Sequence, residues 1–389
     1  MKSIHTVVVL VLLLVFGLLV ACTPTAATPP TSVATEATGE PTSVATEATG
    51  EPSTPPTEAP ESAAELEEVS VAYVPIIAMA PLYLADELGY FAARGIVNNV
   101  QSVANPYDLL GVQSQGELDV NIVGTSAAFF NAVNQGLGVR AVADRMQYLC
   151  SSDNLLLART AAWEEGLKTP ADLEGKTIAI IARGSGTEYW LGLILERVGL
   201  TLSDVNIVTL SYPDTVNALR TGAIDAGFVV QPLAVTALNE DIARRIVGMH
   251  EVLPGQQLGE LIFSQDFIER NDGELAKNWL AAWLEGVRFY LDPANKDQVI
   301  ATISEWTQVE EEVVEQLYGT DQWPWMNPNG DLDVDYIAAN DGAWMLEHEL
   351  IEHLPAPNEY YDDRAIQAAQ AEVGRIEFER DCSTVPPLQ

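Results

Sequence analysis

The alternation of apolar and polar residues in the middle of the chain predicts a strand that opens into a helix. Residues 177–182 (TIAIIA) form a β-branched, apolar run of the kind that lies buried on both faces of a sheet. Glycine interrupts this run at residues 184–187 (GSGT), and apolar residues at helical spacing follow as far as Gly199. Such a junction leaves several backbone N–H groups unpaired at one point, where a ligand can bind, although a plain strand-to-helix turn has the same pattern. The junction matches neither a dinucleotide-binding fingerprint nor a P-loop.

An internal repeat strengthens the interpretation of this junction as part of a site. Residues 105–126 (NPYDLLGVQSQGELDVNIVGTS) align without a gap on residues 211–232 (SYPDTVNALRTGAIDAGFVVQP), and the Gly-x-hydrophobic-Asp turns at 116–119 and 222–225 coincide. Each copy reads as a helix, a turn, a strand and a polar residue that opens another helix. The repeat predicts two similar α/β lobes. Ligands of open α/β sheets lie beyond the carboxyl ends of the strands, so one site is expected in the cleft between the lobes.

The first residues of the chain have the pattern of a secretory signal. Residues 1–21 contain a basic Lys2, a long apolar run and a small Ala21 immediately before Cys22. The sequence Leu-Val-Ala-Cys at 19–22 resembles the bacterial lipobox, at which Cys22 would be acylated and become the mature N-terminus. An ordinary signal peptide or an N-terminal anchor is the alternative. We expect a protein tethered by lipid to the outer face of a bacterial cell membrane.

A low-complexity segment separates this signal from the rest of the chain. Residues 22–66 are rich in Thr, Pro, Ala and Glu, and TSVATEATGEP occurs twice in succession at 31–41 and 42–52. So few large apolar residues cannot form a core, which predicts a disordered spacer. Glycosylation of this segment stays open.

Charge and cysteine content narrow the class of protein. The formal net charge of −37 argues against nucleic acid or an anionic membrane surface as a partner, and adaptation of an exported protein explains such acidity. The chain has 3 cysteines, and Cys150 and Cys382 can form a disulfide outside the cell or be two unrelated residues.

The chain order predicts how the two lobes are connected. Lobe one comprises 67–153 and 260–389, and lobe two comprises 154–259, with two crossings that form a hinge. The last hundred residues are helical in pattern, and we expect them to cover lobe one and brace the mouth of the cleft.

Several motifs together resemble one family of binding proteins. They are VAYVPIIAMAPLYLADELGYFAARGI at 71–96, the two Gly-x-hydrophobic-Asp turns, GTSAAF at 124–129, TPADLEGKTIAI at 169–180, GSGTEYW at 184–190 and Gln231-Pro232. The chain resembles the solute-binding proteins of ABC importers, in the branch of nitrate, taurine and alkanesulfonate binders that also includes pyrimidine-precursor and riboflavin binders. The resemblance covers about residues 69–290. It implies an α/β, two-lobed periplasmic-binding-protein fold with a hinge and C-terminal helices, a small-molecule solute, and delivery to a membrane permease driven by a cytoplasmic ATPase.

The resemblance also implies where the ligand binds. It places contacts on the turns that follow the strands of both lobes. These residues are Pro75, Ile76, Gly124, Thr125, Ser126, Gly184, Ser185, Gly186, Thr187 and Gln231. Arg183 is the cation beside these turns, and it reads equally as an anion ligand or as a surface residue paired with Glu188.

Aromatic residues near the turns favour a planar ligand. Tyr83 and Trp190 lie close to the predicted turns, and Trp323 and Trp325 occupy a long loop that can overhang the cleft. Stacked rings gain roughly 0.5–1.5 kcal/mol per pair, although each of these rings can also be core. We therefore expect a heteroaromatic vitamin or precursor such as riboflavin or a pyrimidine. The alternative is an alkanesulfonate, taurine or nitrate, which the apolar Pro75-Ile76-Ile77 turn disfavours.

An enzyme of the same fold and a stalked binder of macromolecules are the two other classes of function. The fold family includes an iron-dependent pyrimidine synthase that needs a cysteine cluster and an active-site histidine, which this sequence lacks. The segment HELIEH at 348–353 misses both zinc-protease spacings by one residue. We therefore expect no enzyme, no cofactor and no metal, and a monomer. A stalked binder of macromolecules is the third class, but it leaves the repeated lobes unexplained.

Overall fold

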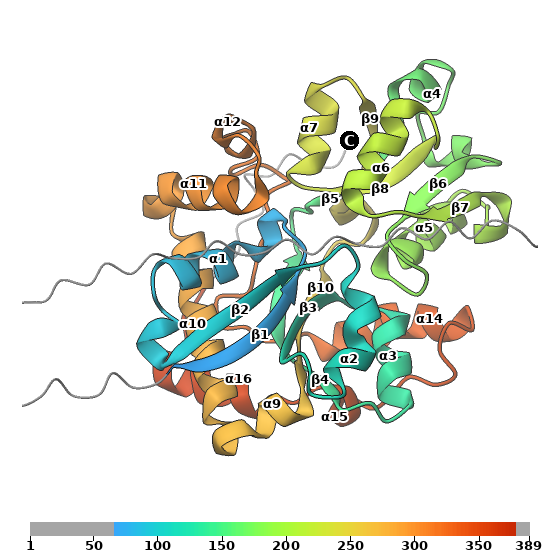
Figure 1. Cartoon of the computed structure of the whole chain (residues 1–389). Coiled ribbons are helices and arrows are strands. Elements are labelled where there is room, and N and C mark those ends of the chain that lie inside the picture. The colour runs from blue at the N-terminus through green and yellow to red at the C-terminus, as the bar shows by residue number, and fades with distance from the viewer. Residues whose placement is uncertain (1–65, 379–389) are drawn as a thin grey trace, which may run out of the picture. The chain divides into compact units, whose positions relative to one another are not determined.

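Two five-stranded sheets with the same strand order organise the protein (Figure 1). The computed structural model describes residues 66–378, which belong to one compact unit, Ser62–Gln389. The predictions for the signal, for the spacer, for Cys22 and for Cys382 lie outside the described residues. The first sheet runs in the order β2 (Ile96–Ser102), β1 (Glu67–Tyr73), β3 (Val120–Gly124), β10 (Gln256–Ser264) and β4 (Val139–Tyr148). The second runs β7 (Asn206–Thr209), β6 (Thr177–Ile180), β8 (Ala226–Val230), β5 (Asn154–Arg159) and β9 (Ala243–Gly248).

The matching strand orders confirm the duplication predicted from the repeat. In each sheet the first three strands of this order are parallel, and the fourth strand, β10 or β5, is antiparallel to both of its neighbours. The chain passes from β4 into β5 and returns from β9 into β10, so it crosses twice between the lobes. The boundary expected at residues 259 and 260 falls inside β10, which belongs to the first sheet from Gln256 onward.

The aspartates of the repeated turns hold corresponding strands together. Asp119 accepts a hydrogen bond from the backbone N–H of Ser70 at 2.9 Å, and Asp225 accepts one from Thr177 N–H at 3.0 Å. Each carboxylate also pairs with an arginine, at 2.6 Å for Arg270 and 3.3 Å for Arg159. The Gly-x-hydrophobic-Asp motif therefore fixes the last parallel strand of each lobe against the first.

The helices divide between the two lobes and a C-terminal layer. Lobe one carries α1 (Ala80–Glu87), α2 (Leu110–Gln113) and α3 (Ala127–Asn134), and lobe two carries α4 (Thr160–Glu164), α5 (Gly186–Glu196), α6 (Tyr212–Thr221), α7 (Leu233–Asn239) and α8 (Met249–Val252). The C-terminal layer contains α9 (Gln265–Glu269), α10 (Glu274–Leu291), α11 (Lys296–Thr307), α12 (Glu311–Glu315), α13 (Val334–Tyr336), α14 (Ala343–Glu347), α15 (Pro357–Tyr360) and α16 (Arg364–Val373). Within the described part of the chain, no helix has the length and apolar character to cross a membrane.

The longest helix shows why the C-terminal layer covers lobe one. Apolar side chains of α10 recur at helical spacing, and Trp279, Trp283 and Tyr290 among them are almost completely buried. This face packs against α1 and α16. The helix α10 therefore lies against α1 of lobe one.

The C-terminal layer also contacts lobe two, and Trp344 makes one of these contacts. Trp344 of α14 lies against α5, where its indole Nε1 donates to Glu196 Oε1 at 3.0 Å and its ring centroid is 5.0 Å from that of Tyr189. A Cβ atom at Gly192 would overlap the Trp344 ring. The missing side chain at Gly192 therefore creates the space for this contact.

We predict that Gly192→Ala lowers the free energy of unfolding by about 1–3 kcal/mol, because the added methyl group overpacks the Trp344 contact. Urea unfolding followed by circular dichroism measures the change. Gly111→Ala is the matched control, since Gly111 lies in α2 with open space around it and should be neutral or slightly stabilising. Equal stability of the two variants would contradict the packing role of Gly192.

Candidate functional site

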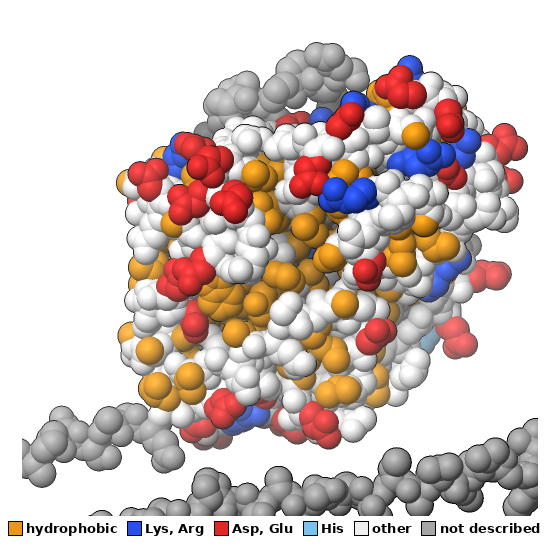
Figure 2. Space-filling view, turned by 45° about the horizontal axis from the view of Figure 1, so that its top comes forward, with side chains coloured by type: hydrophobic (Ala, Val, Ile, Leu, Met, Phe, Trp, Pro, Cys, Tyr) orange, Lys and Arg blue, Asp and Glu red, His pale blue; other side chains and the backbone are white. Residues whose placement is uncertain are grey.

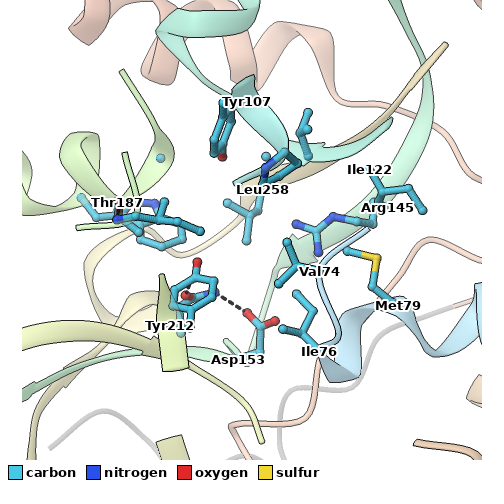
Figure 3. Close-up of a pocket in the computed structure, with 17 residues that line it drawn as sticks. Val74, Ile76, Met79, Tyr107, Ile122, Arg145, Asp153, Thr187, Tyr212 and Leu258 are labelled. Carbon is cyan, nitrogen blue, oxygen red and sulfur yellow. Dashed lines mark hydrogen bonds between the residues drawn. The ribbon is translucent and has the colours of Figure 1, made fainter. Parts of the chain in front are cut away.

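A small cavity of about 50 Å³ lies between the lobes, and residues from both of them form its wall (Figure 3). The turns after β1, β3 and β6 contribute, as do the starts of the helices that follow β2, β6 and β7. The lining residues are Val74, Ile76, Met79, Pro106, Tyr107, Ile122, Val123, Gly124, Arg145, Asp153, Asn154, Ile181, Gly186, Thr187, Trp190, Tyr212 and Leu258. The cleft predicted from the repeat therefore contains a defined space.

A second cavity of about 220 Å³ adjoins the first and shares Val74, Ile76 and Tyr212 with it. Its other walls are mostly apolar and again come from both lobes, including Pro75 and Leu233. Apolar side chains gather in the middle of the face seen in Figure 2, with most charged side chains around them. The two adjoining spaces suit a ligand with one polar and one apolar end.

The structure brings some of the predicted contacts to these cavities. Ile76, Gly124, Gly186, Thr187 and Trp190 line the first cavity, which we call the inner cavity. Pro75 and again Ile76 line the second, which we call the outer cavity. The other predicted contacts do not line either cavity. They are Tyr83, Thr125, Ser126, Arg183, Gly184, Ser185 and Gln231.

The hydroxyl groups of Thr125, Ser126 and Ser185 form hydrogen bonds within the protein instead of lining a cavity. Ser126 Oγ accepts from Phe129 N–H at 3.2 Å and so caps α3, and Ser185 Oγ donates to the Ala182 carbonyl at 2.7 Å. Thr125 Oγ1 is hydrogen-bonded to the Glu260 carboxyl group. Buried polar groups need such partners, and these three side chains have found them within the protein.

Gly184 and Gln231 instead connect parts of the closed structure. The Gly184 carbonyl accepts from Ala128 N–H of lobe one at 3.3 Å. Gln231 Oε1 accepts from Val235 N–H at 3.0 Å, and its Nε2 donates to Gln322 of the C-terminal layer at 2.6 Å. Both residues therefore hold the cleft together from outside the cavity.

Arg183 is a surface residue paired with Glu188, which is the second of the two roles expected for it. Its guanidinium group pairs with Glu188 Oε1 at 2.6 Å, and 58% of its side chain is exposed. The cation that lines the cavity is Arg145, which the sequence analysis did not select.

Packing places Tyr83, Trp323 and Trp325 away from the cavity, although the sequence predicted that they lie near the ligand. Tyr83 is fully buried and stacks on Trp306 of α11 at 4.4 Å, because its position in α1 faces the C-terminal layer. Trp323 stacks on Tyr290 at 5.4 Å, and Trp325 packs against Phe378. Neither tryptophan lines the cavity. The rings that do so are Tyr107, Trp190 and Tyr212.

A double irregularity in the first sheet directs Arg145 into the cleft. Gly259 of β10 pairs with Met146 of β4, and the next residue, Glu260, pairs with Asp144, so Arg145 has no partner in register. Leu258 of β10 also has no partner in register. Both Arg145 and Leu258 line the cavity. Bulges of this kind re-aim side chains next to functional sites.

Gly259 makes room for the arginine. A Cβ atom at this position would overlap the Arg145 guanidinium group. The one sign of this arrangement in the sequence is a glycine inside an otherwise regular strand pattern, which marks a bulge or a close approach.

Several buried carboxyl groups surround the arginine. Asp153 lines the cavity, and its Oδ1 accepts from Tyr148 Oη at 3.1 Å and from Asn154 Nδ2 at 2.8 Å. Burial raises the pKa of Asp153, while Arg145 acts in the opposite direction. Burial also raises the pKa of Asp144 to about 7 and that of Glu260 well above its usual range. The site therefore combines one cation with carboxyl groups that resist ionisation.

Direct hydrogen bonds show that the lobes are closed on each other. Trp190 Nε1 of lobe two donates to Gln256 Oε1 of β10 at 3.0 Å, and Ile77 N–H donates to the Gln231 carbonyl at 3.3 Å. Gln256 Nε2 in turn donates to Asp341 Oδ1 at 3.2 Å, which extends the connection into the C-terminal layer. Because Trp190 also lines the cavity, one residue joins the site to the closed arrangement.

Two similar α/β lobes closed over a cavity with polar and aromatic walls form a two-lobed periplasmic-binding-protein fold. The chain belongs to the NMT1-like family, which matches residues 62–304. It is 28% identical over 257 residues to the riboflavin-binding protein RibY of Chloroflexus aurantiacus, covering 62% of this chain and 66% of that protein.

Solved structures share the fold. The alkanesulfonate-binding protein SsuA from Xanthomonas axonopodis pv. citri bound to MOPS has a TM-score of 0.61 at 20% identity and covers 76% of this chain and 96% of its own. The desulfurization enzyme DSZB has a TM-score of 0.57 at 17% identity and covers 79% of this chain and 99% of its own. The fold therefore occurs in both binding proteins and enzymes. Only the residues of the site can distinguish these two functions.

We predict that the protein loses stability as pH rises and that Asp341→Asn reduces this loss. Burial raises the pKa of Asp341 to about 8 from an ordinary value of 3.8. Between these values the folded protein holds a proton that the unfolded chain has released. Its free energy of unfolding then falls by up to about 1.4 kcal/mol per pH unit.

Urea unfolding between pH 5 and pH 9 measures this slope for the protein, for Asp341→Asn and for the exposed control Asp108→Asn. Asp144 and Glu260 preserve part of the slope in the Asp341 variant. An unchanged slope in Asp341→Asn would show that this carboxyl group stays ionised in the folded protein.

Proposed function

We propose that this protein is the extracytoplasmic solute-binding subunit of an ABC importer, which captures a small organic solute between its lobes and delivers it to a membrane permease. The observation that carries the proposal is the cavity closed by turns of both lobes, with a buried, unpaired Arg145 in its wall. Membership of the NMT1-like family and the similarity to RibY support it. The permease acts with a cytoplasmic ATPase.

We favour a planar heteroaromatic solute, a vitamin or precursor such as riboflavin or a pyrimidine. Tyr107, Trp190 and Tyr212 line the cavity from the two lobes. Stacking against such rings adds roughly 0.5–1.5 kcal/mol per pair to the burial of apolar area. The hydroxyl group of Tyr107 lies close to Gly124, which lines the same cavity.

An alkanesulfonate, taurine or nitrate is the second candidate, and Arg145 is the observation that favours it. A guanidinium group binds oxyanions through paired hydrogen bonds. Asp153 in the same cavity opposes a small anion, because two negative groups would then share one buried cation.

The closed structure suggests how binding is coupled to delivery. A ligand can shift an equilibrium between open and closed lobes only through contacts that differ between these states. A solute in the cavity touches turns of both lobes, and closure adds the hydrogen bond between Trp190 and Gln256. We propose that the permease recognises this closed form of a monomer that performs no catalysis and carries no cofactor.

The remaining parts of the proposal concern attachment and covalent chemistry. We propose a lipid anchor on Cys22, with residues 22–66 as the spacer between membrane and lobes. Cys150 is disulfide-bonded in the structure, and we propose Cys382 as its partner, which would attach the C-terminal end to the hinge.

A ligand panel tests the proposed function. We predict that riboflavin or a pyrimidine quenches tryptophan fluorescence of the purified protein, and that ligand at 100 times its dissociation constant raises the free energy of unfolding by about 2.7 kcal/mol. Taurine, MOPS and nitrate serve as the comparison. A response to these anions alone would discard the heteroaromatic ligand, and steady conversion of any bound solute would discard the binding role in favour of an enzyme.

Peptide mass spectrometry of the protein from bacterial membranes tests the covalent predictions. We expect a lipid-modified N-terminal peptide that begins at Cys22 and, without reductant, one linked peptide that contains Cys150 and Cys382. Cys22→Ser should release the protein from the membrane fraction. An unmodified Cys22 in membrane-bound protein would refute the anchor.

A further inference from the structure

Two ionisable side chains in the inner cavity have buried polar atoms that lack hydrogen-bond partners. Arg145 is 5% exposed and Asp153 is fully buried, and both line the cavity. Among the described residues, Arg145 Nε and Nη1 have no hydrogen-bond partner, and neither does Asp153 Oδ2. Figure 3 shows the guanidinium group and the carboxylate directed toward the middle of the same space.

Unpaired buried groups of this kind are expensive for a folded protein. A buried donor or acceptor without a partner costs about 1–3 kcal/mol, and a charged one costs more. Arg145 and Asp153 do not pair with each other, since neither takes part in an ion pair of the described residues. A solute that supplies both missing partners therefore gains affinity from both groups at once.

The surrounding structure holds the two groups in place. Tyr148 and Asn154 both donate hydrogen bonds to Asp153 Oδ1, and Asp153 Oδ2 accepts none. The bulge at Arg145 and the missing side chain at Gly259 position the guanidinium group. Groups that are fixed in this way recognise the edge of a rigid ligand better than flexible surface charges do.

Building on the proposed function, we infer that the site selects a neutral ring whose edge carries a hydrogen-bond acceptor and an N–H donor, with the acceptor bound by Arg145 and the donor bound by Asp153. A cyclic amide or imide has such an edge, and the rings of Tyr107, Trp190 and Tyr212 cover its faces. A sulfonate or nitrate offers acceptors alone and leaves Asp153 unpaired next to an anion.

Calorimetric titration with matched ligands tests the inference. The probes are riboflavin and 1-methylthymine, each beside its N3-methylated derivative, which keeps the ring and both carbonyl groups but lacks the ring N–H donor. The proteins are the full chain and its Arg145→Gln, Asp153→Asn and Gly259→Ala variants. Gly111→Ala is the control for a glycine change away from the site.

We expect Arg145→Gln and Asp153→Asn each to weaken binding of the recognised ring about 10- to 100-fold. N3-methylation should weaken binding to the unaltered protein by a similar factor, and Asp153→Asn should remove most of that difference. Gly259→Ala should resemble Arg145→Gln, because the added methyl group displaces the guanidinium group. Melting temperatures without ligand show whether each variant is folded, and Arg145→Gln should not be less stable than the unaltered protein.

The possible results separate the inference from the proposed function. If the unaltered protein binds a ring and both substitutions leave its affinity unchanged, the inference is wrong and the heteroaromatic ligand stands. If the methylated and unmethylated rings bind equally well, Asp153 does not read the donor and the inference is wrong. If the unaltered protein binds neither ring, the proposed ligand class and the inference fail together.

Discussion

The structure depends on a carboxylate that clamps two adjacent parallel strands in each lobe. Asp119 holds β3 against β1 through the backbone N–H of Ser70, and Asp225 holds β8 against β6 through the backbone N–H of Thr177. Parallel strands fixed at one end are also aligned at the other. The turns that leave their carboxyl ends therefore gather at one edge of each sheet, which is where the ligand cavity forms.

The repetition of this clamp explains why the fold was predictable. The Gly-x-hydrophobic-Asp turn is short, local and present twice, so sequence alone established two similar lobes and the position of the cleft. The polar residues of the turns were harder to interpret. Ser126 and Ser185 lie where the resemblance placed ligand contacts, but their hydroxyl groups complete the turns themselves. Capping a helix and binding a solute require the same residue types, so the pattern does not distinguish them.

Arg145 and Asp153 could not be found in this way, because their positions depend on residues that are distant in the sequence. Arg145 reaches the cavity through a bulge against β10 and through the space above Gly259. The tyrosines did leave a signal. Tyr107 and Tyr212 stand one position apart in the aligned repeat, each beside a proline at the start of a helix. Rings at corresponding helix starts in both lobes point to a shared ligand.

The hydrogen bond from Trp190 to Gln256 also sets a limit on release kinetics. Trp190 forms part of the cavity wall and is bonded across the cleft. Under the proposed function, a solute leaves the closed form only when the lobes separate, which breaks this bond. The first step of dissociation is therefore the same for every solute. Weakly held solutes escape at the rate at which the lobes separate, and none escapes faster. A permease that separates the lobes would shorten the residence time of all solutes together, whatever their individual affinities.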